Sequence, residues 1–313
     1  MNKGITLGID TSNYTTSVAL IGEDGVVIAN LKKLLTVKAG ERGLRQSDAV
    51  FAHVKNLPTL MSEARGILNG RKIARVGVST RPRNLDGSYM PCFLVGAAAA
   101  ESISAAMNIP LYKYSHQCGH VMAALYSSGR TDLLDGRHFC AFHVSGGTTE
   151  MLRVCATDSG FFASVIGEAA DLNAGQLIDR VGVMMGLSFP AGPQLERLAL
   201  ENVAKIPKKK PHISDFKLNL SGIENASARL YRESGSAELT AAFVLDHVAD
   251  ALSMLAEGYE EKFGKTEFVF AGGVMSNSII KNKLSGRFNA SFAEPAMSAD
   301  NAVGIAALAS REI

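Results

Sequence analysis

The sequence predicts an α/β protein built as two similar lobes that face a central cleft. Two stretches, residues 5–21 and 139–154, each read as a strand, a short polar turn and a second strand. Helical patterns follow both stretches. Repetition of one supersecondary unit is typical of duplicated folds, because each copy buries its apolar face within its own lobe. We therefore predict an N-terminal lobe of residues 1–135 plus 294–313 and a C-terminal lobe of residues 136–293.

In the N-terminal half, the alternation at residues 5–9 predicts a strand and residues 10–13 a polar turn. A second strand follows at 16–21, and Asp24-Gly25 is a hairpin signal before a strand at 26–29. Helical spacing of apolar residues predicts helices at 53–68 and 93–107. The remaining expected elements are strands at 73–78 and 109–112, a loop at 81–91, and a helix that opens near residues 115–120.

The second half repeats this order of elements. Strands at 139–144 and 150–154 flank the polar turn 145–149, and a helix is expected at 170–187. A rigid, proline-containing turn at 189–193 precedes another helix, and residues 205–217 read as a basic loop. The other expected elements are a long amphipathic helix at 237–263, a buried strand at 267–271, a glycine turn at 272–277 that opens a helix, and a last helix that begins at 299–302.

Composition narrows the class of protein. The chain has 313 residues, of which 47% are hydrophobic and 20% charged, so it can bury a sizeable core. A net charge of +2 means that nucleic-acid binding would need a local basic patch. The four cysteines form no C-x-x-C pair, which indicates reduced thiols. The apolar stretch 94–107 is too short to span a bilayer, so we expect a cytoplasmic protein with no membrane partner.

Three turns have the residues of an anion-binding site. Small residues and hydroxyls at 10–13 and 145–149 would let backbone N–H groups approach a polyphosphate. The turn 272–277 joins a buried strand to a helix N-terminus, which allows close approach of a nucleoside or phosphate. This turn matches neither a Walker A loop nor G-x-G-x-x-G. An ordinary hairpin is the alternative interpretation of either polar turn taken alone.

His116 and His120 are spaced i, i+4 and would project from one helix face, where they can share a metal. Asp300, at the start of the last helix, is a plausible third ligand. Residue 117 is Gln, so the carboxylate base of an H-E-x-x-H protease is missing. Two histidines without a metal are the alternative, and Cys118 is expected to pack rather than to ligate.

Two further groups have weaker signals. Asp171 and Asp179 lie two turns apart on the helix predicted at 170–187, so both could point into the cleft, although a solvated helix face is the commoner location of carboxylates. The most basic stretch, residues 205–212, could contact RNA phosphates, but we favour a solvated loop.

In order and spacing, the motifs resemble those of the tRNA threonylcarbamoyladenosine-modifying transferases, a family known as TsaD in bacteria and once named glycoprotease. The resemblance covers nearly the whole chain. It rests on seven short segments, at residues 8–12, 115–120, 144–149, 179–193, 220–222, 271–277 and 299–302.

The resemblance implies a two-lobed actin/sugar-kinase/Hsp70-like fold, made of duplicated RNase H-like halves. It implies that a divalent metal, iron or zinc, is bound by His116, His120 and Asp300. Substrate phosphate or carbamoyl would be held by the loop of His143, Val144, Ser145, Gly146 and Gly147, and the nucleoside part by Asp179, Gly192 and Asn277. The candidate catalytic residues are Asp10, Ser12 and Asp179.

The implied reaction moves threonylcarbamoyl from threonylcarbamoyl-adenylate to N6 of the tRNA adenosine beside the anticodon. The expected ligands are an ATP- or AMP-type nucleotide or this adenylate, and the expected partners are tRNA and accessory proteins of a tRNA-modification complex. The chain departs from the family pattern at residues 80–91, Thr148 and Gln176. Two alternatives stay open: metal- and ATP-dependent carbamoyl or phosphoryl transfer to a small molecule, or a non-catalytic partner subunit. The retained metal triad argues against the second alternative.

Overall fold

The computed structural model describes residues 4–12, 14–36, 44–136, 138–157 and 160–312. The chain divides into two compact units. The first comprises Met1–Gly136, Ala156–Ala163 and Ala299–Ile313, and the second comprises Arg137–Cys155 and Ser164–Ser298. The two units depart from the expected lobes in three places. The first segment ends at residue 136 instead of 135, the short segment at 156–163 groups with the first unit, and the C-terminal boundary lies at residue 299 instead of 294.

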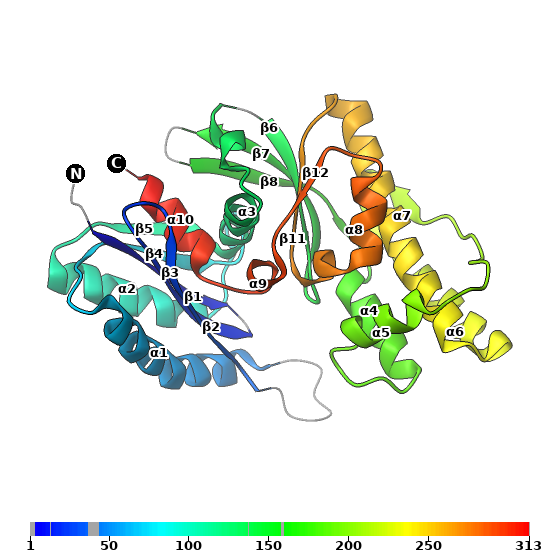
Figure 1. Cartoon of the computed structure of the whole chain (residues 1–313), viewed down its shortest axis with the longest axis horizontal. Helices are drawn as coiled ribbons and strands as arrows, with labels where there is room; N and C mark the ends of the chain where they lie inside the picture. The colour runs from blue at the N-terminus through cyan, green and yellow to red at the C-terminus, as the bar shows by residue number, and fades with distance from the viewer. Residues whose placement is uncertain (1–3, 13, 37–43, 137, 158–159, 313) are drawn as a thin grey trace. The chain divides into compact units, whose positions relative to one another are not determined.

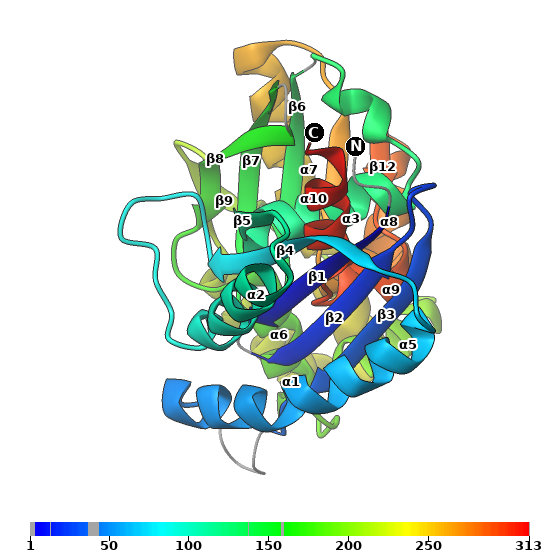
Figure 2. The same ribbon diagram turned by 90° about the vertical axis from the view of Figure 1, so that its left-hand side faces the viewer.

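The first unit is built on a five-stranded sheet in the order β3-β2-β1-β4-β5. The strands β1, β2 and β3 form an antiparallel meander, whereas β4 and β5 run parallel to β1. Helices α1 and α2 lie on one side of this sheet and α3 and α10 on the other (Figures 1 and 2). The elements are β1 (Ile5–Ser12), β2 (Thr15–Ile21), β3 (Val27–Leu34), α1 (Gln46–Leu68), β4 (Ile73–Arg81), α2 (Phe93–Met107), β5 (Leu111–Ser115), α3 (His116–Ser127), η1 (Thr131–Leu134) and α10 (Val303–Arg311).

The polar side chains at the end of strand β1 point alternately to the two faces of the sheet. It continues through Ser12, so the expected turn at 10–13 is wrong for residues 10–12, while Asn13 lies outside the described residues. The reason is pairing: Asp10, Thr11 and Ser12 stay in register with β2. Because side chains alternate along a strand, Thr11 faces α2, where its hydroxyl donates to the carbonyl of Cys92 at 3.0 Å. Asp10 and Ser12 therefore face α3 and α10.

The second unit is built on a seven-stranded mixed sheet in the order β12-β11-β6-β7-β8-β10-β9. Strands β6 and β7 are antiparallel, and β11 runs parallel to β6. The elements are β6 (His138–Val144), β7 (Thr149–Thr157), β8 (Gly160–Ala169), α4 (Ala174–Met184), α5 (Gly192–Leu200), β9 (His212–Ser214), β10 (Lys217–Asn219), α6 (Ser221–Ser234), α7 (Ala237–Phe263), β11 (Phe268–Ala271), η2 (Gly273–Ser276), α8 (Ser278–Ser285), β12 (Ala290–Phe292) and α9 (Pro295–Ser298).

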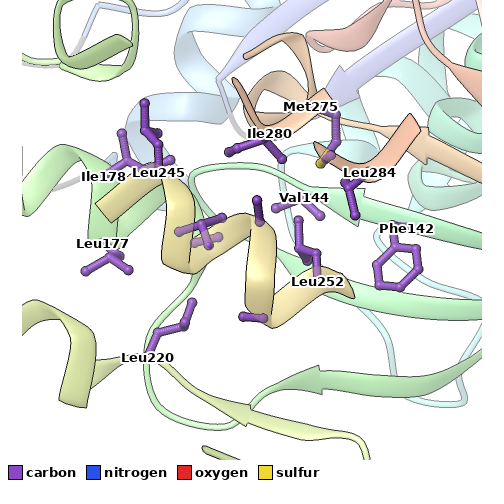
Figure 3. Close-up of a cluster of buried hydrophobic side chains, with 14 of the residues drawn as sticks. Phe142, Val144, Leu177, Ile178, Leu220, Leu245, Leu252, Met275, Ile280 and Leu284 are labelled. Carbon is purple, nitrogen blue, oxygen red and sulfur yellow. The ribbon is translucent and has the colours of Figure 1, made fainter. Parts of the chain in front are cut away.

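The core of this unit gathers around α7 (Figure 3). Leu245 and Leu252 of α7 are fully buried and belong to one apolar cluster with Phe142 of β6. Burial of a side chain of this size contributes about 1.5–3 kcal/mol each. Helix α7 is long and apolar enough to cross a membrane by length and composition, but 78% of its apolar window is buried inside the protein. The core helix of a globular unit is buried to the same kind of extent, so α7 is only weak evidence for a membrane span.

The helix predicted at 170–187 is shorter than expected, and this changes the position of Asp171. Helix α4 begins at Ala174, and Asp171 precedes it. The carboxylate of Asp171 accepts hydrogen bonds from the backbone N–H of Leu220 at 2.8 Å and of Ser221 at 3.2 Å. Those groups lie at the start of α6, where helix N–H groups lack intrahelical partners. Asp171 therefore caps α6 instead of sharing a helix face with Asp179, and the expected pair is wrong.

Candidate functional site

The first unit brings His116, His120 and Asp300 together. Helix α3 begins at His116, and the Ser115 hydroxyl caps it by accepting from the N–H of Cys118 at 3.2 Å. This start places the two histidines one turn apart on a single face. The His120 Nε2 atom lies 3.0 Å from His116 Nε2 and 3.2 Å from Asp300 Oδ1, and His116 Nε2 lies 3.6 Å from the same oxygen.

These three atoms fit a metal ion. In a tetrahedral site with metal–ligand bonds of about 2.0–2.1 Å, neighbouring ligand atoms lie about 3.3 Å apart. The observed separations of 3.0, 3.2 and 3.6 Å fall on both sides of that value. Two imidazole nitrogens and one carboxylate oxygen suit zinc or iron. Among the residues that the structure describes, these three form the group whose ligand atoms all lie within 4.8 Å of one another. Cys118 is not part of it, and its Sγ accepts from Asn84 Nδ2 at 3.1 Å.

The polar end of β1 supports the triad. Asp10, with 1% of its side chain exposed, accepts a hydrogen bond from His116 Nδ1 at 2.8 Å. The Ser12 hydroxyl donates to Asp300 Oδ2 at 3.2 Å. The second oxygen of Asp10 accepts from the Ser79 hydroxyl. A carboxylate on the outer nitrogen of a ligating histidine fixes its tautomer and its ring orientation. Asp10 therefore turns the Nε2 atom of His116 toward His120 and Asp300.

Electrostatics favour a proton on the triad in the metal-free protein. Burial alone would lower the pKa of His116, but the negative charge of Asp10 and its hydrogen bond, with Asp300 as a second carboxylate, raise it to about 10. Burial would raise the pKa of Asp300, but hydrogen bonds from His116 and His120 lower it well below its usual range. A metal ion must therefore displace a proton from His116.

Replacing Asp10 with asparagine is expected to loosen the hold on His116. The substitution removes the charge that raises the pKa of His116, so this pKa should fall below about 10 in the metal-free protein, as measured by NMR titration of the imidazole. Metal affinity should fall by about 10–100-fold, because an amide no longer fixes the tautomer of the ligand. A variant whose His116 pKa and metal affinity both equal those of the parent would contradict this role for Asp10.

In the second unit, the loop after β6 is open to solvent. Gly146 and Gly147 are exposed, and no atom would lie within 4 Å of a Cβ added at either residue. The loop is held by the N–H of Ser145, which donates to the carbonyl of Thr148 at 2.7 Å, and by Asn173 Nδ2, which donates to the carbonyl of Gly147 at 3.0 Å. An anion could therefore approach the backbone of this loop without a steric barrier.

Two residues of the expected phosphate-binding segment, His143 and Val144, lie in β6, in agreement with the strand predicted at 139–144. His143 and Val144 are the last residues of the strand, and Val144 is fully buried in the apolar cluster of the second unit. The side chain of Val144 therefore faces the core, and the turn begins at Ser145, as predicted from the sequence. The cause is the pairing of β6 with β7 and β11, which continues to the end of the strand.

The glycine turn lies against the end of β6. Gly272 has φ +98°, and a Cβ at this position would lie 2.3 Å from the carbonyl oxygen of Val144. Only glycine accepts both this backbone conformation and this approach. The turn is followed by Asn277, whose Oδ1 accepts from the N–H groups of Ile279 and Ile280 at 3.1 Å each. Asn277 is thus the N-cap of α8, and its side-chain amide oxygen is engaged in that role.

Asp179 and Gly192 are brought together in the same unit. Asp179 lies on α4, and its carboxylate accepts from the N–H of Ala191 at 2.8 Å, directly before Gly192 opens α5. Burial raises the pKa of Asp179, and the Ala191 hydrogen bond opposes this shift. The nearest neighbour of a Cβ at Gly192 would be Ile178 at 3.9 Å, so the start of α5 is accessible.

The residues predicted from the sequence therefore form two sets. The metal ligands with Asp10 and Ser12 belong to the first unit, and the loop of Ser145 with Asp179, Gly192 and Asn277 belongs to the second. Sequence reasoning missed Ser79. Its signal was the pairing of parallel strands, because β1 and β4 run side by side with Ile9 opposite Val78, which places Asp10 beside Ser79.

Comparison with known proteins identifies what the chain is similar to. The model of the family TsaD, tRNA N6-adenosine threonylcarbamoyltransferase, matches residues 30–307. A curated relative, the tRNA N6-adenosine threonylcarbamoyltransferase of Methanopyrus kandleri, is 27% identical over 274 residues, which cover 87% of this chain and 76% of the relative.

Solved structures confirm the predicted fold class. The HypF protein of T. kodakarensis matches with a TM-score of 0.64 at 11% identity, over 99% of this chain and 47% of that one. A glucokinase of the ROK family from Streptomyces griseus matches with a TM-score of 0.54 at 12% identity, over 98% and 99% of the two chains. The activator of 2-hydroxyisocaproyl-CoA dehydratase from Clostridium difficile matches with a TM-score of 0.53 at 14% identity, over 98% and 94%. The fold is thus of the actin/sugar-kinase type.

Proposed function

The chain belongs to the TsaD family of tRNA N6-adenosine threonylcarbamoyltransferases, and from this premise we propose that it moves threonylcarbamoyl from threonylcarbamoyl-adenylate to N6 of the tRNA adenosine beside the anticodon. The observation that carries the proposal is the triad of His116, His120 and Asp300, with Asp10 on the outer nitrogen of His116. Two histidines that served only to pack would not need a carboxylate on one ring nitrogen of His116 to turn the other toward the remaining ligands.

The ligand roles follow from the two sets of residues. His116, His120 and Asp300 would hold iron or zinc, which would supply a Lewis acid that polarises the transferred carbonyl and stabilises the charge of the leaving phosphate. Asp10 keeps the proton of His116 on Nδ1, and Ser12 orients the carboxylate of Asp300. The exposed backbone at Gly146 and Gly147 would bind phosphate oxygens.

The nucleoside part of the adenylate would lie at the start of α5. Asp179 fixes that start through the N–H of Ala191, and its oxygens can accept from ribose hydroxyls. Gly192 leaves room for the ligand, and Asn277 supports the neighbouring turn. Residues that position reactants contribute by holding them in a productive geometry, and oriented dipoles contribute by stabilising developing charge. The expected partners are tRNA and accessory proteins of a tRNA-modification complex in the cytoplasm.

A second candidate function uses the same chemistry on another acceptor. The loop at residues 80–91 departs from the family pattern, and it carries Arg81 and Arg83 next to the start of α3, where Gln117 N donates to the carbonyl of Pro82 at 3.0 Å. Cationic side chains there favour an anionic small molecule as the acceptor of a carbamoyl or phosphoryl group. This alternative shares the metal triad and differs in the acceptor.

Nucleoside mass spectrometry separates the two functions. Metal-loaded protein is mixed with threonylcarbamoyl-adenylate and unmodified tRNA, with and without candidate accessory proteins, and the tRNA is digested. We expect threonylcarbamoyladenosine to form, and we expect at least a 100-fold lower rate after chelation of the metal. If the adenylate and the metal are bound but the tRNA stays unmodified in every mixture, the tRNA function is refuted and the small-molecule acceptor is favoured.

A further inference from the structure

A polar cavity in the first unit does not include the metal triad. Its volume is about 170 Å³, which is below the roughly 300–1,000 Å³ of sites for drug-sized ligands. All of its lining residues belong to the first compact unit, which takes in the end of β7 and the start of β8, and they include Arg81, Asn84, Tyr114, Phe161, Leu308 and Glu312. The cavity is too small for a nucleotide and suits a ligand of a few heavy atoms.

The guanidinium of Arg81, which lines this cavity, is held in place by uncharged groups. Arg81 ends β4, and its Nη2 donates to Asn84 Oδ1 at 3.0 Å, while its Nη1 contacts the Thr80 hydroxyl at 3.5 Å. Asn84 is itself fixed, because its Nδ2 donates to Cys118 Sγ at 3.1 Å. In the described part of the chain, no carboxylate forms an ion pair with Arg81. A half-buried guanidinium with neutral partners is prepared for a carboxylate, because its planar fork matches two oxygens.

The opposite charge in the cavity limits the charge of the ligand. Glu312 lines the same space and accepts from the Tyr114 hydroxyl at 3.0 Å. Burial and this neighbouring carboxylate raise the pKa of Tyr114, so its phenol remains a donor. Lys113, the other cation, is paired with Glu101 at 2.6 Å. Glu312 repels each negative charge of a ligand, so a ligand with one carboxylate meets less repulsion than a ligand with two.

We propose that this cavity binds a small monocarboxylate, with the carboxylate in the fork of Arg81. Phe161 and Leu308 supply apolar walls for a short carbon chain. The Tyr114 proton goes to Glu312, so the Tyr114 hydroxyl oxygen and the Glu312 carboxylate both offer acceptors to a hydroxyl or ammonium group on the ligand. The site is separate from the metal triad, since none of the metal ligands lines it.

The test is binding of defined acids to the full-length, metal-loaded protein by isothermal titration and saturation-transfer NMR. The probes are lactate and alanine as monocarboxylates, malonate as a dicarboxylate, and inorganic phosphate. We expect saturable, millimolar binding of a monocarboxylate. Arg81→Met should weaken it at least tenfold, and Arg81→Lys by a smaller factor, since lysine keeps the charge but lacks the fork. Asn84→Ala should also weaken it, because it releases Arg81 without a change of charge.

The matched control is Arg65→Met, which removes the same charge from an exposed position on α1 and should leave binding unchanged. The melting temperature and the metal content of each variant show whether it is folded, and the lysine variant retains the test if Arg81→Met does not fold. The inference is overturned if no monocarboxylate binds, if Arg81→Met binds as well as the parent, or if malonate or phosphate binds more tightly than the monocarboxylates.

Discussion

Replacing His120 with alanine is expected to abolish stoichiometric metal binding. His120 has 4% of its side chain exposed, and its Nε2 is the atom nearest to both other ligands, at 3.0 and 3.2 Å. Without it, one nitrogen and one carboxylate remain, which is fewer than the three protein ligands of typical catalytic sites. Metal content measured by mass spectrometry should fall from about one ion per chain to near zero, and competition with a chelator should show at least a 100-fold loss of affinity.

Cys118→Ser is the matched control for this experiment. Cys118 lies between the two histidines in sequence, but its Sγ contacts Asn84 and not the triad. Its replacement should leave metal content unchanged. Equal loss of metal from both variants would show that the effect comes from disruption of α3 and not from loss of a ligand. Full metal content in His120→Ala would refute the triad itself.

The sequence predicted the parts of the site that depend on local spacing. Histidines at i, i+4 share a helix face wherever the helix forms, so His116 and His120 could be paired before the structure was known. Asp300 is 180 residues from His120, and no periodicity links the two; its place at the start of the last helix made it a candidate, and the family resemblance supplied the full ligand set. The contact itself is a consequence of α10 packing on α3, which only the three-dimensional structure displays.

Errors arose where long-range pairing overrode local signals. Asp10, Thr11 and Ser12 have the composition of a turn, yet β2 holds them in the sheet. Asp171 was predicted to lie in a helix, but its carboxylate caps the start of α6, which is about fifty residues away. Ser79 carried no local signal, since its role comes from the neighbouring parallel strand β1. The fold class was predictable because it depends on the order of strands and helices, which these errors did not change.

The contact between α3 and α10 gives a second large expected effect, on stability and on the metal site together. A Cβ at Gly304 would lie 1.8 Å from the carbonyl oxygen of Gly119 and 2.8 Å from the N–H nitrogen of Ala123. Both are backbone atoms of α3, so no side chain can rotate away. Gly304→Ala should therefore push α10 from α3 and cost about 2–3 kcal/mol, even after the gain of about 1 kcal/mol in helix propensity.

The same displacement would move Asp300, which lies just before α10, away from His116 and His120, so metal affinity should fall at least tenfold with the stability. Denaturant unfolding and chelator competition measure the two effects. Gly66→Ala on α1 is the matched control, because no atom lies within 4 Å of its added Cβ and the substitution should stabilise the protein slightly. If Gly304→Ala is as stable as Gly66→Ala and binds metal normally, the close approach of the two helices does not set the position of Asp300. If Gly304→Ala loses stability and metal affinity while Gly66→Ala keeps both, the packing of α10 on α3 fixes the geometry of the metal ligands.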